Sequence, residues 1–367
     1  MDIQTIRWHV GRGWSAPLPE LDGRETLVLV FADPTLTNHP DRPLQDALAH
    51  FAGACVLGCS TAGQLDGDSV SDDSVVVTVT RFETTRLSLA SVDIAAAGGP
   101  RRCGRQIANA LRDPQLRGVL MLSDGLGINA SALAAGIADE LPGIEISGGL
   151  AGDGERFADT WVLVRGEPRP GWVTAVGIAG ADVEMHFGAA SGWDAFGPDR
   201  VVTRSHGNVV YELDSRPALA LYDEYLGGRG NALPASAHLL PLSVVDLDGR
   251  TSLRTVLAID APRQSIQFAG DVAQGSIVRL MQASNERLVE GARRAAAMAA
   301  TGREQLAFAV SCVGRRMVLG QCTEDELDAV VETLRVGTSL VGFYGYGELS
   351  PANGRCDLHS QTMTITT

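Results

Sequence analysis

Short apolar runs of strand length alternate with amphipathic stretches of helical length along most of the chain. The first example is the run Leu27–Phe31, which is followed by an amphipathic stretch over residues 43–51. Continuous apolar runs of this length are typical of buried strands, and apolar positions three or four residues apart are typical of helices. Two runs, 75–80 and 86–91, have no helix between them and are expected to pair antiparallel. The pattern predicts the α/β class with α+β elements, built on mixed sheets.

A unit of strand, helix, strand and glycine loop occurs three times, which indicates an internal repeat. The units start at Leu27, Val119 and Leu306, their helices cover 43–52, 130–141 and 323–335, and their loops cover 58–64, 147–153 and 342–348. Each loop ends in a glycine followed by a polar residue, and these glycines are Gly63, Gly152 and Gly347. We expect them to occupy matching turns in two related mixed-sheet domains with internally repeated strand–helix–strand units.

The length and composition predict two domains. The chain has 367 residues, of which 45% are hydrophobic, and this is sufficient for two ordinary cores. A polar, glycine-rich passage over residues 188–198 separates two halves of the pattern. We therefore predict a lead-in over residues 1–25, a first domain over 26–205 and a second domain over 206–367.

The charge balance argues against two classes of partner. The chain has 44 acidic and 30 basic residues, a net charge of −14. Nucleic acids and anionic membranes are bound by clustered basic residues, so we expect neither as a partner. No apolar run reaches the roughly 20 residues of a membrane-spanning helix, and the first residues do not resemble a secretory signal. These features predict a cytoplasmic location.

The sequence contains no lysine, so all 30 basic residues are arginine. A guanidinium stays protonated and cannot act as an amine nucleophile. Schiff-base chemistry, attachment of pyridoxal phosphate and the lysine-dependent phosphate loop are therefore excluded.

The three glycine loops are the candidate ligand sites. Ligands of α/β proteins usually lie at the carboxyl ends of strands, and backbone N–H groups of a glycine loop can hold an anion. None of the loops carries a nucleotide-binding motif, and a tight crossover turn is the alternative interpretation. The candidate ligand-binding residues are Gly58, Cys59, Ser60, Gly63, Gly149, Asp153, Tyr344, Tyr346 and Glu348. Arg315 and Arg316 are expected to pair with Glu348, and gripping a ligand carboxylate is the alternative.

Two of the six cysteines raise the alternative of a catalytic thiol. Cys59 and Cys312 are the candidates, but neither has a histidine close to it in the sequence. A nucleophilic thiol needs a base and a lowered pKa, whereas most free cysteines are buried. We therefore expect buried thiols and no catalytic residues. The sequence has no C-x-x-C pair, so we expect no zinc site.

Several motifs resemble those of the FIST family of bacterial sensory domains. The first-half motifs are Gly58-CSTAGQL and Gly148-GLAGDG, and the second-half motifs are Tyr211-ELDSRPALALYDEYLG, Ser311-CVGRR with Gly320, Gly342-FYGYGELSP and Cys356-DLHSQTMTIT. The resemblance covers roughly residues 25–367 and implies a FIST N domain followed by a FIST C domain. It implies a sensor of a small ligand in signal transduction, with amino acids as one proposed ligand class. No output domain is recognisable, so the signal is expected to pass to a separate partner protein.

One subgroup of the family implies a more specific function. Free-standing members of similar length and layout bind haem, sense nitric oxide and regulate a partner histidine kinase of a two-component system. Haem needs an imidazole that reaches the iron from an apolar slot. Strand alternation places His359 on one face with Met363 and Ile365, so we expect His359 as the axial ligand and His206 as the second choice. A small non-haem ligand such as an amino acid and a cysteine-dependent enzyme remain the alternatives, and a homodimer is compatible with each.

Overall fold

The computed structural model describes residues 1–226, 240–247, 249, 251–352 and 355–367. Its three mixed sheets in the described residues follow one plan, in which a parallel pair of strands lies between antiparallel strands. Each parallel pair is joined through at least one helix, and each belongs to one of the three repeats. The predicted α/β class and the strand–helix–strand units are therefore confirmed.

The first repeat forms a seven-stranded sheet around an apolar parallel pair. Its own elements are β1 (Asp2–His9), β2 (Gly13–Trp14), β3 (Thr26–Ala32), α1 (Pro43–His50), β4 (Cys55–Ser60) and β7 (Ser74–Arg81). Strand β3 lies between β4 and β7 and is buried at every residue. This burial explains why its sequence is a continuous apolar run rather than an alternating one.

The second repeat has the same order with one additional helix. Its own elements are β8 (Arg86–Asp93), α2 (Pro100–Ala110), β9 (Leu116–Ser123), α3 (Ala130–Glu140), β10 (Glu145–Leu150) and β13 (Trp172–Ala179). Helices α2 and α3 pack together, and Gly104 and Gly136 lie at their contact, where a Cβ on either residue would meet the backbone of the other helix.

The third repeat is interrupted by an inserted domain. Its own elements are β14 (Phe187–Ala190), α5 (Asn285–Ala299), β23 (Leu306–Cys312), α6 (Val313–Leu319), α7 (Thr323–Thr333), β24 (Ser339–Gly345) and β27 (Met363–Thr366). The chain leaves the repeat after β14 and returns at α5. The predicted division between residues 205 and 206 lies within a strand of the inserted domain.

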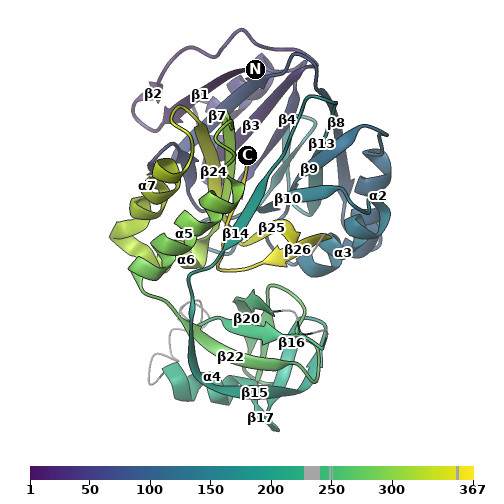
Figure 1. Cartoon of the computed structure of the whole chain (residues 1–367), viewed down its shortest axis with the longest axis vertical. Coiled ribbons are helices and arrows are strands. Elements are labelled where there is room, and N and C mark those ends of the chain that lie inside the picture. Colours follow the sequence, from purple (N-terminus) through teal and green to yellow (C-terminus); the bar gives the residue numbers. More distant parts are fainter. Residues whose placement is uncertain (227–239, 248, 250, 353–354) are drawn as a thin grey trace.

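The described residues of the inserted domain form an eight-stranded antiparallel sheet with its own core, and this domain lies below the three repeats in Figure 1. Its elements are β15 (Asp194–His206), β16 (Val209–Leu213), β17 (Arg216–Pro217), α4 (Ala218–Leu226), β18 (Leu242–Val245), β19 (Thr251–Arg254), β20 (Val256–Asp260), β21 (Ser265–Phe268) and β22 (Ile277–Gln282). Its first and last strands, β15 and β22, pair with each other, so the two connections to the third repeat lie side by side.

In each repeat, a hairpin follows the second parallel strand and pairs with the sheet of another repeat. The hairpins are β5 (Gln64–Asp66) with β6 (Ser69–Ser71), β11 (Val162–Val164) with β12 (Glu167–Arg169), and β25 (Gly347–Ala352) with β26 (Arg355–His359). Strand β5 pairs with β24 of the third repeat, β11 with β4 of the first, and β25 with β10 of the second. The exchange is cyclic, so each repeat needs another repeat to complete its sheet.

A ring of three backbone hydrogen bonds lies where the exchanged chains cross. The N–H of Ala62 donates to the carbonyl of Tyr344 (2.7 Å), that of Gly152 to Ser60 (3.0 Å), and that of Tyr346 to Leu150 (3.2 Å). In every repeat the donor comes two residues after the acceptor, so the ring has approximate threefold symmetry. Side chains also pack between repeats: the Phe31 ring of the first repeat lies 5.9 Å from the Phe308 ring and 4.9 Å from the Phe343 ring of the third.

One glycine position is common to the three repeats. A Cβ at Gly58, Gly148 or Gly342 would lie within 2.3 Å of a carbonyl oxygen of the neighbouring parallel strand, so a larger residue does not fit. Five residues later come Gly63, Asp153 and Gly347. The predicted match of Gly152 with the other two loop glycines is therefore one residue out of register.

The end of the chain differs from the predicted continuous strand. Residues 360–362 separate β26, which lies in the sheet of the second repeat, from β27, which lies in the sheet of the third. Gln361 has a left-handed backbone conformation, with φ +58°, and a regular strand cannot continue through it. His359 therefore does not share a strand face with Met363 and Ile365. None of the helices described in the structure is long and apolar enough to cross a membrane.

Candidate functional site

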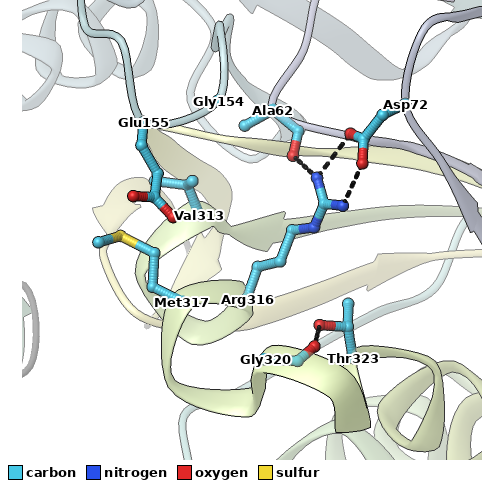
Figure 2. Close-up of a pocket in the computed structure, with 9 residues that line it drawn as sticks. All are labelled: Ala62, Asp72, Gly154, Glu155, Val313, Arg316, Met317, Gly320 and Thr323. Carbon is cyan, nitrogen blue, oxygen red and sulfur yellow. Dashed lines mark hydrogen bonds and ion pairs between the residues drawn. The ribbon is translucent and has the colours of Figure 1, made fainter.

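A cavity of about 360 Å³ lies where loops of all three repeats meet, beyond the carboxyl ends of their parallel strands. The first repeat contributes Ala62 and Asp72, the second contributes Gly154 and Glu155, and the third contributes Val313, Arg316, Met317, Gly320 and Thr323 (Figure 2). This is the edge of the sheets at which α/β proteins usually bind ligands. The exchange of hairpins brings the three loops together, so the cavity depends on the whole three-repeat assembly.

Arg316 provides the positive charge of the cavity. Helix α6 starts directly after β23, and it directs the Arg316 guanidinium toward the loop of the first repeat (Figure 2). Nη1 donates to the Ala62 carbonyl (2.6 Å) and to Asp72 (2.8 Å), and Nη2 donates to the other oxygen of Asp72 (2.6 Å). Burial alone would lower the pKa of Arg316. The contact with Asp72 and the nearby Tyr344 and Glu155 outweigh this effect and hold the pKa above its usual value. The guanidinium therefore stays charged.

Glu155 provides a negative charge at the same cavity. Its loop is ordered by Asp153, whose buried carboxylate accepts the backbone N–H groups of Phe157 (2.8 Å), Ala158 (2.9 Å) and Asp159 (2.8 Å). The Tyr346 hydroxyl also donates to Asp153, and the Tyr346 ring stacks on Phe157 with centres 4.5 Å apart. Asp153 and Tyr346 thus shape the wall of the cavity and do not line it.

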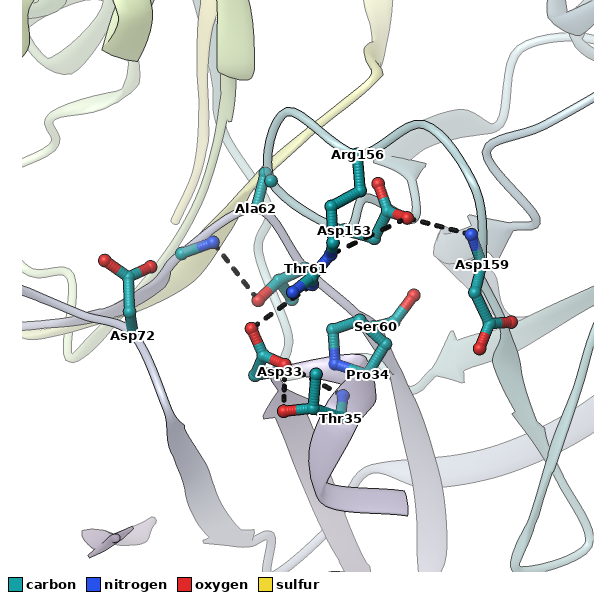
Figure 3. Close-up of polar contacts among 12 residues, drawn as sticks. Asp33, Pro34, Thr35, Ser60, Thr61, Ala62, Asp72, Asp153, Arg156 and Asp159 are labelled. Carbon is teal, nitrogen blue, oxygen red and sulfur yellow. Dashed lines mark hydrogen bonds and ion pairs between the residues drawn. The ribbon is translucent and has the colours of Figure 1, made fainter. Parts of the chain in front are cut away.

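The same loop is tied to the first repeat through Arg156. The Arg156 guanidinium lies 3.4 Å from the carboxylate of Asp33, which follows β3 and also accepts the N–H (2.8 Å) and hydroxyl (2.6 Å) of Thr35 (Figure 3). A second contact, at 4.0 Å, joins Arg156 to Asp153. The loop that carries Glu155 is therefore held both by its own repeat and by its neighbour.

Arg315 fixes the direction of helix α6 from its buried side. Its side chain is fully buried and pairs with the fully buried Glu326 of α7 through two contacts of 3.1 and 2.5 Å. Glu326 also accepts the hydroxyls of Ser311 (3.0 Å) and Tyr344 (2.5 Å). Removing one partner of such a buried pair is strongly destabilising, because it leaves an uncompensated charge. The predicted pairing of Arg315 and Arg316 with Glu348 is wrong: their acidic partners are Glu326 and Asp72.

Glu348 lies in the protein interior and not in the lining of the cavity. One oxygen accepts the N–H of Thr362 (3.1 Å), and the other has no nitrogen or oxygen partner among the described residues, with the Cys312 thiol beside the carboxylate. Burial raises the pKa of Glu348 well above its usual value. The neighbouring Cys312 is also buried, and burial followed by the nearby Glu348 raises the pKa of this thiol.

The other residues predicted for the loops have structural contacts. Gly58 and Gly149 lie in strands where a Cβ would meet neighbouring residues, and the Ser60 hydroxyl accepts the Trp161 N–H (3.1 Å). Cys59 is fully buried in β4, and burial raises the pKa of its thiol. Gly63 is next to the cavity, since a Cβ there would lie 2.6 Å from Nη1 of Arg316.

Neither predicted haem ligand lies at this cavity. His206 is exposed at the end of β15 in the inserted domain. His359 is opposite Glu348 in the β25–β26 hairpin, and burial and the nearby Arg254 guanidinium lower its pKa, while Asp357 raises it. The Arg254 guanidinium donates to the carbonyl of Leu358 (3.2 Å), so a cation, rather than an apolar slot, adjoins His359. No described residue of the cavity lining is a histidine, and the residues present do not fit haem.

Sequence reasoning missed several residues of the cavity. Asp72, Glu155, Met317 and Thr323 were not among the predicted site residues, although Arg316 was singled out as a possible grip on a carboxylate. Asp72 follows the exchanged hairpin β5–β6 and Glu155 precedes the exchanged hairpin β11–β12, so only the threefold assembly brings them to the cavity of Arg316. The one sequence signal for them was the presence of acidic residues shortly after the glycine loops.

Comparison with known proteins identifies two consecutive domain models. The FIST N domain matches residues 26–216, and the FIST C domain matches residues 218–351. An uncharacterised protein of Mycobacterium bovis, Mb0898c, is 25% identical over 347 residues, which cover 89% of this chain and 87% of that protein. An uncharacterised protein of Methanocaldococcus jannaschii, MJ1623, is 24% identical over 331 residues, which cover 80% of this chain and 64% of that protein. The repeats, their loops and these matches show that the chain belongs to the FIST family.

Proposed function

We propose that this protein is a signal-transduction sensor that binds a small zwitterionic ligand, such as an amino acid, in the cavity between its three repeats. The two FIST domains indicate a sensor. The observation that supports the ligand class is the presence of Arg316 and Glu155 in the lining of one cavity. A guanidinium binds a carboxylate through two parallel hydrogen bonds, and a carboxylate binds an ammonium group.

The size and the remaining lining of the cavity agree with this ligand class. A volume of about 360 Å³ is near the lower end of the range of small-molecule sites. Val313, Met317 and Ala62 add apolar surface that a side chain of the ligand contacts. Met317 is suited to this position because its unbranched side chain adapts to ligands of different shape.

Two other functions have less support. Haem sensing of nitric oxide would need a histidine at a slot for the macrocycle, and neither His359 nor His206 lies at the cavity. A cysteine-dependent enzyme would need an accessible thiolate, whereas burial raises the pKa of both Cys59 and Cys312. We therefore propose a non-enzymatic sensor that passes ligand binding to a separate signalling protein, for which a histidine kinase is the first candidate.

The test is thermal unfolding in the presence of each of the twenty L-amino acids. Ligand that binds only the folded state raises the melting temperature. Arg316→Gln is expected to weaken binding by about tenfold to a hundredfold, the usual cost of losing a charge-assisted hydrogen bond. Arg102→Gln is the matched control, because Arg102 is an exposed arginine away from the cavity.

Two outcomes would contradict the proposal. One is an amino-acid response that is the same in the wild type and in Arg316→Gln. The other is a stoichiometric haem absorption spectrum that is lost in His359→Ala and kept in Arg316→Gln, which would favour the haem sensor.

A further inference from the structure

Asp72 already binds the Arg316 guanidinium, the group to which the carboxylate of the proposed ligand would bind. It lies at the corner between β6 and β7, and its two oxygens accept hydrogen bonds from both terminal nitrogens of Arg316 (2.8 and 2.6 Å). This paired geometry is the one in which arginine binds the carboxylate of a ligand. The Asp72 side chain is 57% exposed and that of Arg316 is 26% exposed. Water competes for such an exposed pair, so the pair is easily replaced.

We propose that Asp72 is an internal substitute for the ligand carboxylate, and that ligand binding transfers Arg316 from Asp72 to the ligand. The exchange releases the corner between β6 and β7. The inference rests on the proposed function, because it requires a ligand carboxylate at Arg316.

Arg316 keeps its position when Asp72 leaves. Its Nη1 also donates to the Ala62 carbonyl (2.6 Å), and its guanidinium carbon lies 5.7 Å from the centre of the Tyr344 ring. Tyr344 is fully buried and is itself held by Glu326. The guanidinium is therefore positioned by groups other than Asp72, and Asp72 acts as a competitor for it rather than as its support.

The corner that Asp72 occupies joins two sheets. Strand β6 belongs to the sheet of the third repeat and β7 to the sheet of the first. The hairpin itself stays attached to the third repeat, because β5 pairs with β24 and Glu324 of α7 accepts the N–H of Val70 (3.3 Å). Loss of the Arg316 contact releases only the corner from α6, so occupancy of the cavity changes how the start of β7 in the first repeat is linked to the third repeat. A switch of this kind exchanges one local charge contact and has its effect at a sheet boundary.

The first test compares Asp72→Asn with Asp73→Asn by calorimetric titration. The probe is the L-amino acid that gives the largest thermal shift with the wild type. Asp72→Asn is expected to bind it about twofold to fivefold more tightly, because the competing carboxylate is gone. Asp73→Asn removes the same charge one residue away, where the side chain does not contact Arg316, and its affinity is expected to equal that of the wild type.

The second test is hydrogen exchange of residues 68–74. Addition of the same amino acid should accelerate exchange in the wild type, whereas in Asp72→Asn exchange should be fast already and unaffected by the ligand. Unchanged or weaker binding by Asp72→Asn, with binding still weakened at least about tenfold in Arg316→Gln, would overturn the inference and leave the proposed function standing. If neither the wild type nor Asp72→Asn binds any amino acid, both the inference about Asp72 and the proposed function are overturned.

Discussion

Tyr346 is the residue through which the third repeat orders the loop of the second. Its hydroxyl donates to the buried carboxylate of Asp153, which in turn holds three backbone N–H groups of the loop that carries Glu155. Tyr346→Phe keeps the ring stacked on Phe157 but removes this donor. We expect the free energy of unfolding to fall by about 1–2 kcal/mol, the cost of leaving a buried charged acceptor with one donor fewer.

The measurement is urea denaturation of Tyr346→Phe beside a control, Tyr211→Phe. Tyr211 is partly exposed in the inserted domain, and its ring lies under the Arg204 guanidinium, at 4.7 Å. Tyr211→Phe keeps this ring, so the free energy of unfolding of the control is expected to change by no more than about 0.5 kcal/mol. Equal effects of the two substitutions would show that the Tyr346 hydroxyl does not order the loop.

At the residue scale, the sequence pointed to residues at or beside the cavity but not to their contacts. Asp153 and Tyr346 were singled out from the glycine loops, and Arg316 was singled out as a partner for Glu348 or for a ligand carboxylate. The acidic neighbours of Arg316 could not be predicted, because Asp72 and Glu155 come from other repeats and reach the cavity only through the exchange of hairpins. Spacing along one chain carries no information on which distant loop lies opposite a given side chain.

Among the elements, the three strand–helix–strand units were predictable, whereas the sheets to which the exchanged hairpins pair were not. The units have long apolar strands and amphipathic helices, whose periods are legible in the sequence. Strands β5, β6, β11 and β12 have three residues each, which is too short for a hydrophobic period to show a face or a partner. The break between β26 and β27 was not predicted either, because the residue type of Gln361 does not indicate a left-handed conformation.

Gly148 tests the structural reason for the glycine shared by the three repeats. A Cβ at this position would lie 1.8 Å from the Met121 carbonyl oxygen, and its φ of +144° disfavours every other residue. We expect Gly148→Ala to destabilise the protein by at least about 3 kcal/mol or to prevent folding, because parallel strands would have to separate.

The control for this substitution is Gly127→Ala. Gly127 also has a positive φ, of +66°, but a Cβ there would have no atom within 4 Å. It should cost about 1 kcal/mol, the backbone term alone. The melting temperatures of the two variants separate steric exclusion from backbone strain, and similar losses for both would remove the close approach as the cause.

For the whole molecule, the threefold arrangement explains why the cavity lies where it does. Three strand ends and three loops meet at the ring of backbone hydrogen bonds, and each loop is anchored by a different repeat. A ligand that contacts Ala62, Glu155 and Arg316 together touches all three repeats at once. Binding there is therefore able to change the arrangement of the repeats, which a sensor needs in order to signal to another protein.

The measurement that tests the central claim most directly is calorimetric titration with three related compounds. They are the amino acid that gives the largest thermal shift, the amine that lacks its carboxylate and the acid that lacks its ammonium group. If Arg316 and Glu155 bind the two charges, each singly charged compound should bind at least about tenfold more weakly than the amino acid. Equal affinity for the amino acid and either of the other compounds would contradict the assignment of a zwitterion site to this cavity.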